Sequence, residues 1–303
     1  MHGLAIDLCG IRLRNPLVLA SGILGANPGC LKRAAREGLG AVTLKSIGPE
    51  PRKGHPAPIV ACFDHGMLNA VGYSNPGVDS ACDIYKEQTF SVPVIASVIG
   101  QTPEEFARVV ARFEALDFAA YELPVSCPHT PGFGTMGHQD DPRFVSRVLQ
   151  AVRKETNKPV FVKVPPDQHI QDFGKRIQDS GAAGITAVNT MGPGMAIDIA
   201  SRTPYLGFGR GGLSGPALKP IAVRCVYDLF EAVDIPIIAT GGVSCGADAI
   251  EMFMAGATAV GVGSAVYYRG MAAFRLICQE MQEIMQAQGI AHINDIKGVA
   301  HGA

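Results

Sequence analysis

The sequence predicts an α/β protein, a (β/α)8 or TIM barrel formed by residues 1–303 as a single domain, with inserted loops over its C-terminal face. Eight short apolar or β-branched runs occur along the chain, and amphipathic segments of helical spacing separate most of them. Strands that alternate with helices form parallel sheets, and eight such units are expected to close into a barrel. The length of 303 residues suits one such barrel.

The predicted strands are short segments rich in apolar and β-branched residues. In chain order they are Leu17–Ala20, Ala41–Lys45, Val94–Val98, Ala119–Leu123, Val160–Val164, Gly184–Asn189, Pro236–Gly242 and Ala259–Ser264.

The helices are predicted from start signals and apolar periodicity. In "TPEEFARVVARFEAL", Thr102 can cap the helix and Pro103 suits its first turn, while Phe106, Val109 and Phe113 fall on one face. Similar spacing predicts helices over Asp141–Glu155, Ile170–Ser180, Pro216–Ala232, Gly246–Ala255 and Met271–Gln288.

Two segments interrupt the alternation and are expected to be functional loops. Gly48–Gly77 and Thr190–Gly215 are too rich in glycine and polar residues for simple connections. Loops of this length usually carry function.

Charge and cysteine usage narrow the function class. Lys and Arg (26) nearly balance Asp and Glu (27), so a small molecule is a better candidate ligand than nucleic acid or an anionic membrane. The eight cysteines form no C-x-x-C pair, so no metal site, cluster or dithiol couple is expected. The N-terminus has no signal-peptide pattern and no run of 18 apolar residues occurs, which predicts a cytoplasmic location without a membrane segment.

In a barrel of this class, chemistry belongs at the carboxyl ends of the strands. Gly241-Gly242 and Gly263-Ser264 end the last two predicted strands, where close backbone approach favours an anion, although glycines can also serve tight turns. Lys163 lies within the apolar run "VFVKV" and needs an anionic partner, either a ligand or a neighbouring carboxylate.

Several motifs together carry a resemblance to a known family. They are "LKSIGPEPRKGHPAP", "GMLNAVGYSNPG", "VSCPH", "FVKV", "AVNT", "GGLSGPALKPIAVRCV" and "IIATGGV". With these motifs the chain resembles the class 1 dihydroorotate dehydrogenases, flavin-dependent (β/α)8 barrels of pyrimidine metabolism, over most of its length. The likeness is closest to the NAD-linked catalytic-subunit branch.

The resemblance implies an FMN site. Val188 would lie against the isoalloxazine ring and Lys163 by its N1/O2 edge, where a positive charge stabilises the anionic reduced ring. The implied cofactor-binding residues are Ala20, Ser21, Lys45, Ser46, Ser97, Lys163, Val188, Gly215, Gly241, Gly242, Gly263 and Ser264.

The resemblance also implies the reaction, oxidation of dihydroorotate to orotate. Cys127 would act as general base while hydride passes to flavin N5, with Lys163 as the second catalytic residue. A thiol suits this task because its ordinary pKa, about 8.5, lies near neutrality. The glycines at 132, 134 and 137 would make the following loop a lid. The implied substrate-binding residues are Lys45, Asn69, Ala70, Val71, Gly72, Tyr73, His129, Asn189 and Thr190.

Three positions depart from the family pattern. Pro124 and His129 stand where asparagines are usual on either side of Cys127, and Ser97 replaces an asparagine that contacts FMN. Proline has neither an amide side chain nor a backbone N–H. These departures leave open a different dihydropyrimidine-like substrate.

Other hypotheses about the function remain open from the sequence alone. They are a sugar-phosphate enzyme without flavin, a tRNA-modifying flavin barrel and a non-catalytic flavin-binding subunit. Relatives pass electrons to fumarate or, through an iron–sulfur and FAD subunit, to NAD. The chain lacks a cluster pattern and a Rossmann fingerprint, so such a partner subunit is expected, in a homodimer or heterotetramer.

Overall fold

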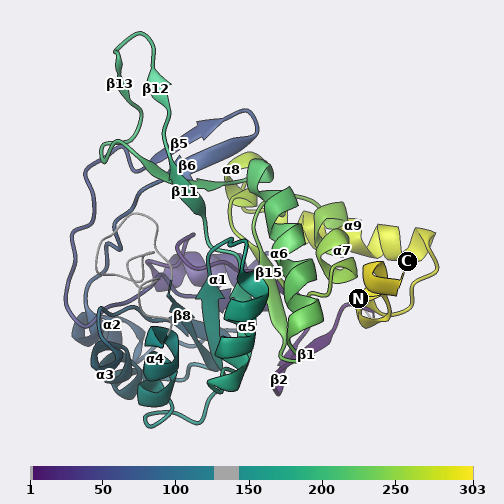
Figure 1. Cartoon of the computed structure of the whole chain (residues 1–303), viewed down its shortest axis with the longest axis horizontal. Coiled ribbons are helices and arrows are strands. Elements are labelled where there is room, and N and C mark those ends of the chain that lie inside the picture. The colour runs from purple at the N-terminus through teal and green to yellow at the C-terminus, as the bar shows by residue number, and fades with distance from the viewer. Residues whose placement is uncertain (1–2, 126–142, 303) are drawn as a thin grey trace.

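A computed structural model describes residues 3–125 and 143–302, and its centre is a closed barrel of eight parallel strands. The strands follow one another around the barrel in chain order, as they do in a (β/α)8 barrel (Figure 1). The predicted fold class and all eight predicted strands are therefore confirmed. The strands are β3 (Leu17–Leu19), β4 (Ala41–Thr43), β7 (Val94–Ser97), β8 (Ala120–Pro124), β9 (Val160–Val164), β10 (Gly184–Ala187), β15 (Ile237–Thr240) and β16 (Ala259–Val262).

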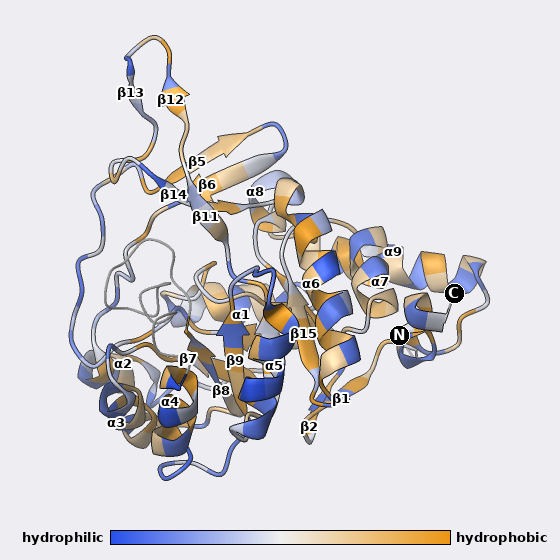
Figure 2. Ribbon diagram, in the orientation of Figure 1, coloured by the Kyte–Doolittle hydropathy of each residue, from blue (hydrophilic) through white to orange (hydrophobic). Residues whose placement is uncertain are grey.

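Helices surround the barrel and turn their apolar faces toward it (Figure 2). In α3 the Thr102 hydroxyl caps Glu105 N, and Phe106, Val109 and Phe113 are fully buried, as their spacing predicts. The α-helices are α1 (Pro28–Arg36), α2 (Val78–Tyr85), α3 (Pro103–Phe113), α4 (Phe144–Val152), α5 (Ile170–Asp179), α6 (Lys219–Ala232), α7 (Gly246–Met254), α8 (Ala265–Arg269) and α9 (Ala273–Ala287).

Helices α1, α2 and α8 were not predicted from the sequence. A start signal for α1 is present, because Asn27 caps the helix and Pro28 occupies its first position. Short 3-10 helices lie at Pro216–Leu218, Ile293–Ile296 and Val299–Gly302. In the described part of the chain, no helix combines the length and apolar character that crossing a bilayer requires.

The two segments expected to be loops contain strands, so that expectation was wrong in part. Strands β5 (Val60–Phe63) and β6 (Gly66–Asn69) of the first segment join β11 (Met191–Gly194) and β14 (Gly211–Ser214) of the second in one antiparallel sheet. The segments meet where β6 pairs with β14, with Leu68 opposite Leu213. Pairing within each segment forms β5–β6 and β11–β14, whereas the β6–β14 pairing joins distant segments, which local sequence patterns do not reveal.

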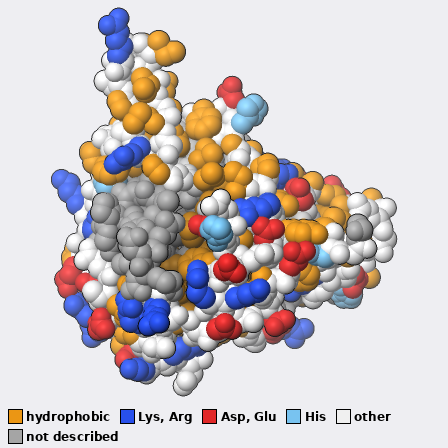
Figure 3. Space-filling model, in the orientation of Figure 1, with side chains coloured by type: hydrophobic (Ala, Val, Ile, Leu, Met, Phe, Trp, Pro, Cys, Tyr) orange, Lys and Arg blue, Asp and Glu red, His pale blue; other side chains and the backbone are white. Residues whose placement is uncertain are grey.

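Two small hairpins complete the fold. Strands β12 (Ile197–Asp198) and β13 (Thr203–Pro204) form an arm that projects from the molecule (Figure 1). Apolar side chains gather along this arm, among them the exposed Met195, Ile197 and Ile199 (Figure 3). Strands β1 (Ile6–Leu8) and β2 (Ile11–Leu13) pair near the N-terminus.

Candidate active site

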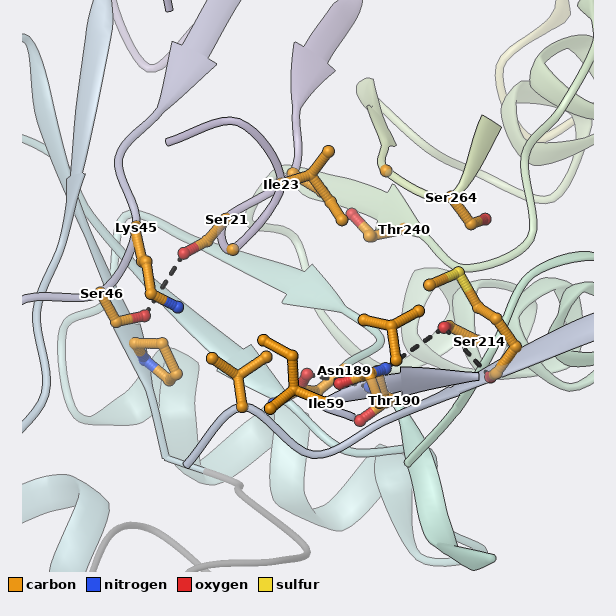
Figure 4. Close-up of a pocket in the computed structure, with 18 of the residues that line it drawn as sticks. Ser21, Ile23, Lys45, Ser46, Ile59, Asn189, Thr190, Ser214, Thr240 and Ser264 are labelled. Carbon is orange, nitrogen blue, oxygen red and sulfur yellow. Dashed lines mark hydrogen bonds between the residues drawn. The ribbon is translucent and has the colours of Figure 1, made fainter. Parts of the chain in front are cut away.

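A cavity of about 490 Å³ lies at the carboxyl ends of the barrel strands, and residues of the inserted sheet, Val60, Met67, Asn69 and Ser214, form part of its lining (Figure 4). This size is typical of small-molecule sites. Most residues that the sequence analysis singled out line it. They are Ala20, Ser21, Lys45, Ser46, Asn69, Val71, Gly72, Tyr73, Lys163, Val188, Asn189, Thr190, Gly215, Gly241, Gly242, Gly263 and Ser264.

The turn after β15 brings backbone close to the cavity. Gly241 and Gly242 have φ angles of +133° and +77°, a region that side chains disfavour. A Cβ atom on Gly242 would lie 2.6 Å from Lys219 Cβ and 2.9 Å from the Gly215 carbonyl oxygen. The turn can therefore pack in this way only with glycine.

Two lysines reach the cavity from neighbouring parts of the barrel. Lys45 follows β4, and burial lowers the pKa of its ammonium group. Lys163 lies on β9 and is 6% exposed, with its Nζ 3.9 Å from Glu122 Oε1 on the adjacent strand β8. The sequence left open whether the partner of Lys163 is a ligand or a neighbouring carboxylate. The structure shows the carboxylate of Glu122 nearby and also places Lys163 at the cavity wall, where it can face a ligand.

A row of hydroxyl groups lies beside Lys45 (Figure 4). Ser21 Oγ donates to the Leu44 carbonyl at 2.8 Å and lies 3.3 Å from Ser46 Oγ, which in turn lies 2.8 Å from Ser97 Oγ. Ser97 is fully buried and does not line the cavity, so it contacts the site through Ser46.

Two amide side chains, Asn69 and Asn189, also line the cavity, and Asn189 lies across it from Ser21 and Ser46 (Figure 4). Asn69 Nδ2 donates to the Gly212 carbonyl at 3.2 Å and to Ser214 Oγ at 3.3 Å, so the β6–β14 pairing fixes its position. Asn189 Oδ1 accepts a 2.9 Å hydrogen bond from Thr190 N. The cavity therefore combines amide and ammonium groups, which suits a ligand with several carbonyl and N–H groups.

Comparison with known proteins identifies the family of the chain. The family model described as dihydroorotate dehydrogenase matches residues 3–285. The chain belongs to the dihydroorotate dehydrogenase family. Enzymes of this family are oxidoreductases that act on CH–CH groups, which agrees with the enzyme class implied by the motifs.

Curated relatives match the chain over nearly its whole length. The dihydroorotate dehydrogenase B (NAD(+)) catalytic subunit of Pyrococcus abyssi is 42% identical, covering 98% of this chain and 99% of that protein. The subunit of the same name from Methanosarcina mazei is 46% identical, covering 98% and 95%. A solved dihydroorotate dehydrogenase from Eimeria tenella in complex with ferulenol shares the fold, with a TM-score of 0.84, 23% identity and coverage of 99% and 89%.

Among the described residues, two predicted site residues, Ala70 and Ser97, do not line the cavity. Ala70 is buried in a small apolar cluster with Leu68 and Leu206. Cys127 and His129 lie outside the described residues, as do the glycines at 132, 134 and 137. Pro124 is one of the three residues that differ from the family pattern. It lies at the end of β8 and lines the cavity.

His55 was not among the site residues predicted from the sequence. Its ring lines the cavity and stacks on Phe208 with centroids 3.8 Å apart, and its Nε2 is buried. Burial, and then the charge of Arg52, lower the pKa of this histidine. Its place within "RKGHPAP", one of the motifs that carry the resemblance, was the signal available in the sequence.

Proposed function

We propose that the chain oxidises dihydroorotate to orotate with FMN bound in the cavity, and that residues 1–303 form one domain for this reaction. The observation that carries the proposal is the convergence of Lys45, Lys163, Asn69 and Asn189 on a single cavity in a member of this family. In the oxidation, one ring carbon loses a proton and the adjacent carbon loses a hydride. Bound flavin supplies the acceptor for that hydride.

The turn after β15 suits the phosphate of FMN. Gly241, Gly242 and Gly263 line the cavity, and the backbone there approaches a ligand without intervening side chains. Ser264 lines the same part of the cavity and offers a hydroxyl group. We assign the phosphate to these residues and the ring system to the strand ends that carry Ser21, Lys45, Lys163 and Val188.

The two lysines and the amides would bind and orient the reacting groups. Lys163 would balance negative charge that develops on the flavin, and Lys45 would donate to ligand oxygens near the hydroxyl row. Asn69 and Asn189 would pair with the alternating carbonyl and N–H groups of a dihydropyrimidine. Each amide is already oriented by its neighbours, so binding costs little side-chain ordering.

We assign the base to Cys127, which would accept the proton removed from the substrate. Cys127 lies outside the described residues, and the assignment depends on the motif "VSCPH". Pro124, three positions earlier in the sequence, lines the cavity. The experiment described below tests the assignment directly.

We also propose that electrons leave the flavin through a partner subunit. The relatives from Pyrococcus abyssi and Methanosarcina mazei are named as catalytic subunits of NAD(+)-linked enzymes. An iron–sulfur and FAD subunit would carry the electrons to NAD in a heterotetramer.

A cytoplasmic location is supported by the described cysteines, which are all free.

Anaerobic flavin spectroscopy tests the proposed reaction. FMN-loaded protein should lose its visible flavin absorbance when dihydroorotate is added, and Cys127→Ala and Cys127→Ser should lose this reduction while still binding FMN. Bleaching that is equally fast in both variants would reject Cys127 as the base. A yellow, FMN-loaded wild-type protein that dihydroorotate does not reduce would reject dihydroorotate as substrate.

Oxidation of another dihydropyrimidine is a second candidate function. Pro124 at the cavity wall offers neither an N–H nor an amide side chain, so a substrate edge without hydrogen-bonding groups would suit contact with this residue. Dihydrouracil and dihydrothymine, added in the same experiment, distinguish this reaction from dihydroorotate oxidation.

A further inference from the structure

A group of charged side chains lies behind the glycine turn that follows β15. Lys219, at the start of α6, donates through Nζ to Asp248 Oδ1 and to Glu251 Oε2, both at 2.8 Å. Asp248 and Glu251 lie on α7, which packs beside α6 (Figure 1). The Asp248 side chain is 10% exposed and that of Glu251 is 49% exposed. None of the three is among the residues that line the cavity.

Asp248 holds the end of the turn through its second oxygen. Its Oδ2 accepts hydrogen bonds from Ser244 N at 2.8 Å, Ser244 Oγ at 2.7 Å and Cys245 N at 3.1 Å. Burial alone would raise the pKa of this carboxyl, but the hydrogen bonds from Lys219 and Ser244 outweigh it and lower the pKa. One carboxylate thus ties the start of α6 to the segment that follows Gly241 and Gly242.

Lys219 also contacts the turn directly from behind. Gly242 packs so closely on it that an added Cβ would lie 2.7 Å from Lys219 N and 2.6 Å from Lys219 Cβ. The other side of Gly241 and Gly242 faces the cavity. A shift of Lys219 or of Ser244 would therefore move the backbone N–H groups of the turn relative to a ligand.

We propose that Asp248 is a positioning residue for the phosphate end of the cofactor site. It holds the glycine turn in one conformation, so that a phosphomonoester binds without the cost of ordering the backbone. This inference rests on the proposed function, because it takes the phosphate to lie at this turn. It assigns to Asp248 a role beyond capping α7.

Neutralising Asp248 also has an electrostatic effect on FMN affinity, and this effect is opposite in sign to the loss of positioning. Lys219, Asp248 and Glu251 carry a net charge of −1 behind the turn. Electrostatics alone would therefore make FMN bind more tightly when Asp248 becomes neutral, because an anion is repelled less. Positioning predicts weaker binding, since asparagine cannot accept hydrogen bonds on both sides. The direction of the change distinguishes the two effects.

The test compares FMN with riboflavin, which lacks only the phosphate. Apoprotein is titrated with each flavin and binding is followed by quenching of flavin fluorescence, in wild type, Asp248→Asn and the control Glu251→Gln. We expect Asp248→Asn to raise the Kd for FMN about tenfold, the loss of roughly one charged hydrogen bond, and to leave the Kd for riboflavin unchanged. Glu251→Gln, which touches Lys219 but not the turn, should leave both Kd values within about twofold.

Several results would overturn the inference. Equal weakening of FMN and riboflavin would show a general structural role, and unchanged or tighter FMN binding would reject positioning. If Asp248→Asn does not fold, Ser244→Ala removes one of the four hydrogen bonds of Asp248 and should weaken FMN alone, about threefold. A wild-type protein that binds neither flavin would instead reject the proposed function, and one that binds both equally would reject a phosphate at the turn.

Discussion

The buried pair of Lys163 and Glu122 provides the sharpest prediction about stability. The two side chains are 7% and 5% exposed, and their charged atoms lie 3.9 Å apart on adjacent strands of the barrel. Glu122 Oε1 has no hydrogen-bond partner among the described residues. The perturbation is Lys163→Met, which keeps an unbranched apolar side chain and removes the charge that faces Glu122.

The magnitude follows from the distance and the burial. At 3.9 Å and an effective dielectric constant of about 20, the attraction between the two charges is about 4 kcal/mol. Desolvation offsets much of this attraction in the intact pair, but removal of one partner leaves the other charge buried. We therefore expect Lys163→Met to lower the free energy of unfolding by about 3–5 kcal/mol. The double variant Lys163→Met/Glu122→Gln should lose clearly less than the single variant, because no uncompensated charge remains.

The assay is equilibrium denaturation of the flavin-free protein in urea, followed by far-ultraviolet circular dichroism. Wild type, Lys163→Met, Glu122→Gln and the double variant form a double-mutant cycle. This cycle separates the coupling energy of the pair from the other contacts of Lys163. A loss below about 1 kcal/mol in Lys163→Met, or additive losses in the double variant, would show that Lys163 does not compensate the buried charge of Glu122.

Two further predictions concern backbone and burial. Gly242→Ala should lower the melting temperature clearly more than the control Gly181→Ala. Both glycines have positive φ angles, but only an added Cβ at position 242 would meet other atoms. Equal decreases in the melting temperatures of the two variants would mean that the packing of Gly242 against Lys219 is unimportant. Burial raises the pKa of Tyr85 from 10.0 to about 12, so the unfolded chain releases this proton first and folding stability falls as pH rises from about 10 to 12. The loss is up to about 2–3 kcal/mol, and urea midpoints measured across this range should fall less steeply in Tyr85→Phe than in wild type.

Local patterns sufficed for the barrel but not for the sheet above it. The run "VFVKV" and the apolar face of α3 can be recognised from neighbouring residues alone. A buried strand needs apolar residues and a surface helix needs one apolar face, so both leave a local pattern in the sequence. In the sheet above the barrel, β5 pairs with β6 and β11 pairs with β14 within their own segments. The two pairs join only where β6 meets β14, with Leu68 opposite Leu213, and these segments lie far apart in the sequence. Glycine-rich composition suggested a loop because it does not reveal a partner strand.

Local patterns in the sequence were enough to predict the alternation of strands and helices, and hence which residues stand at the carboxyl ends of the strands. It also contained the motifs that imply the flavin and the substrate. Contacts between distant residues could be identified only in the folded structure: Glu122 beside Lys163, His55 at the cavity wall, Ser97 behind Ser46 and Asp248 behind the glycine turn. The reason is physical, since strand identity follows from local burial whereas these contacts arise only when barrel closure brings distant residues together.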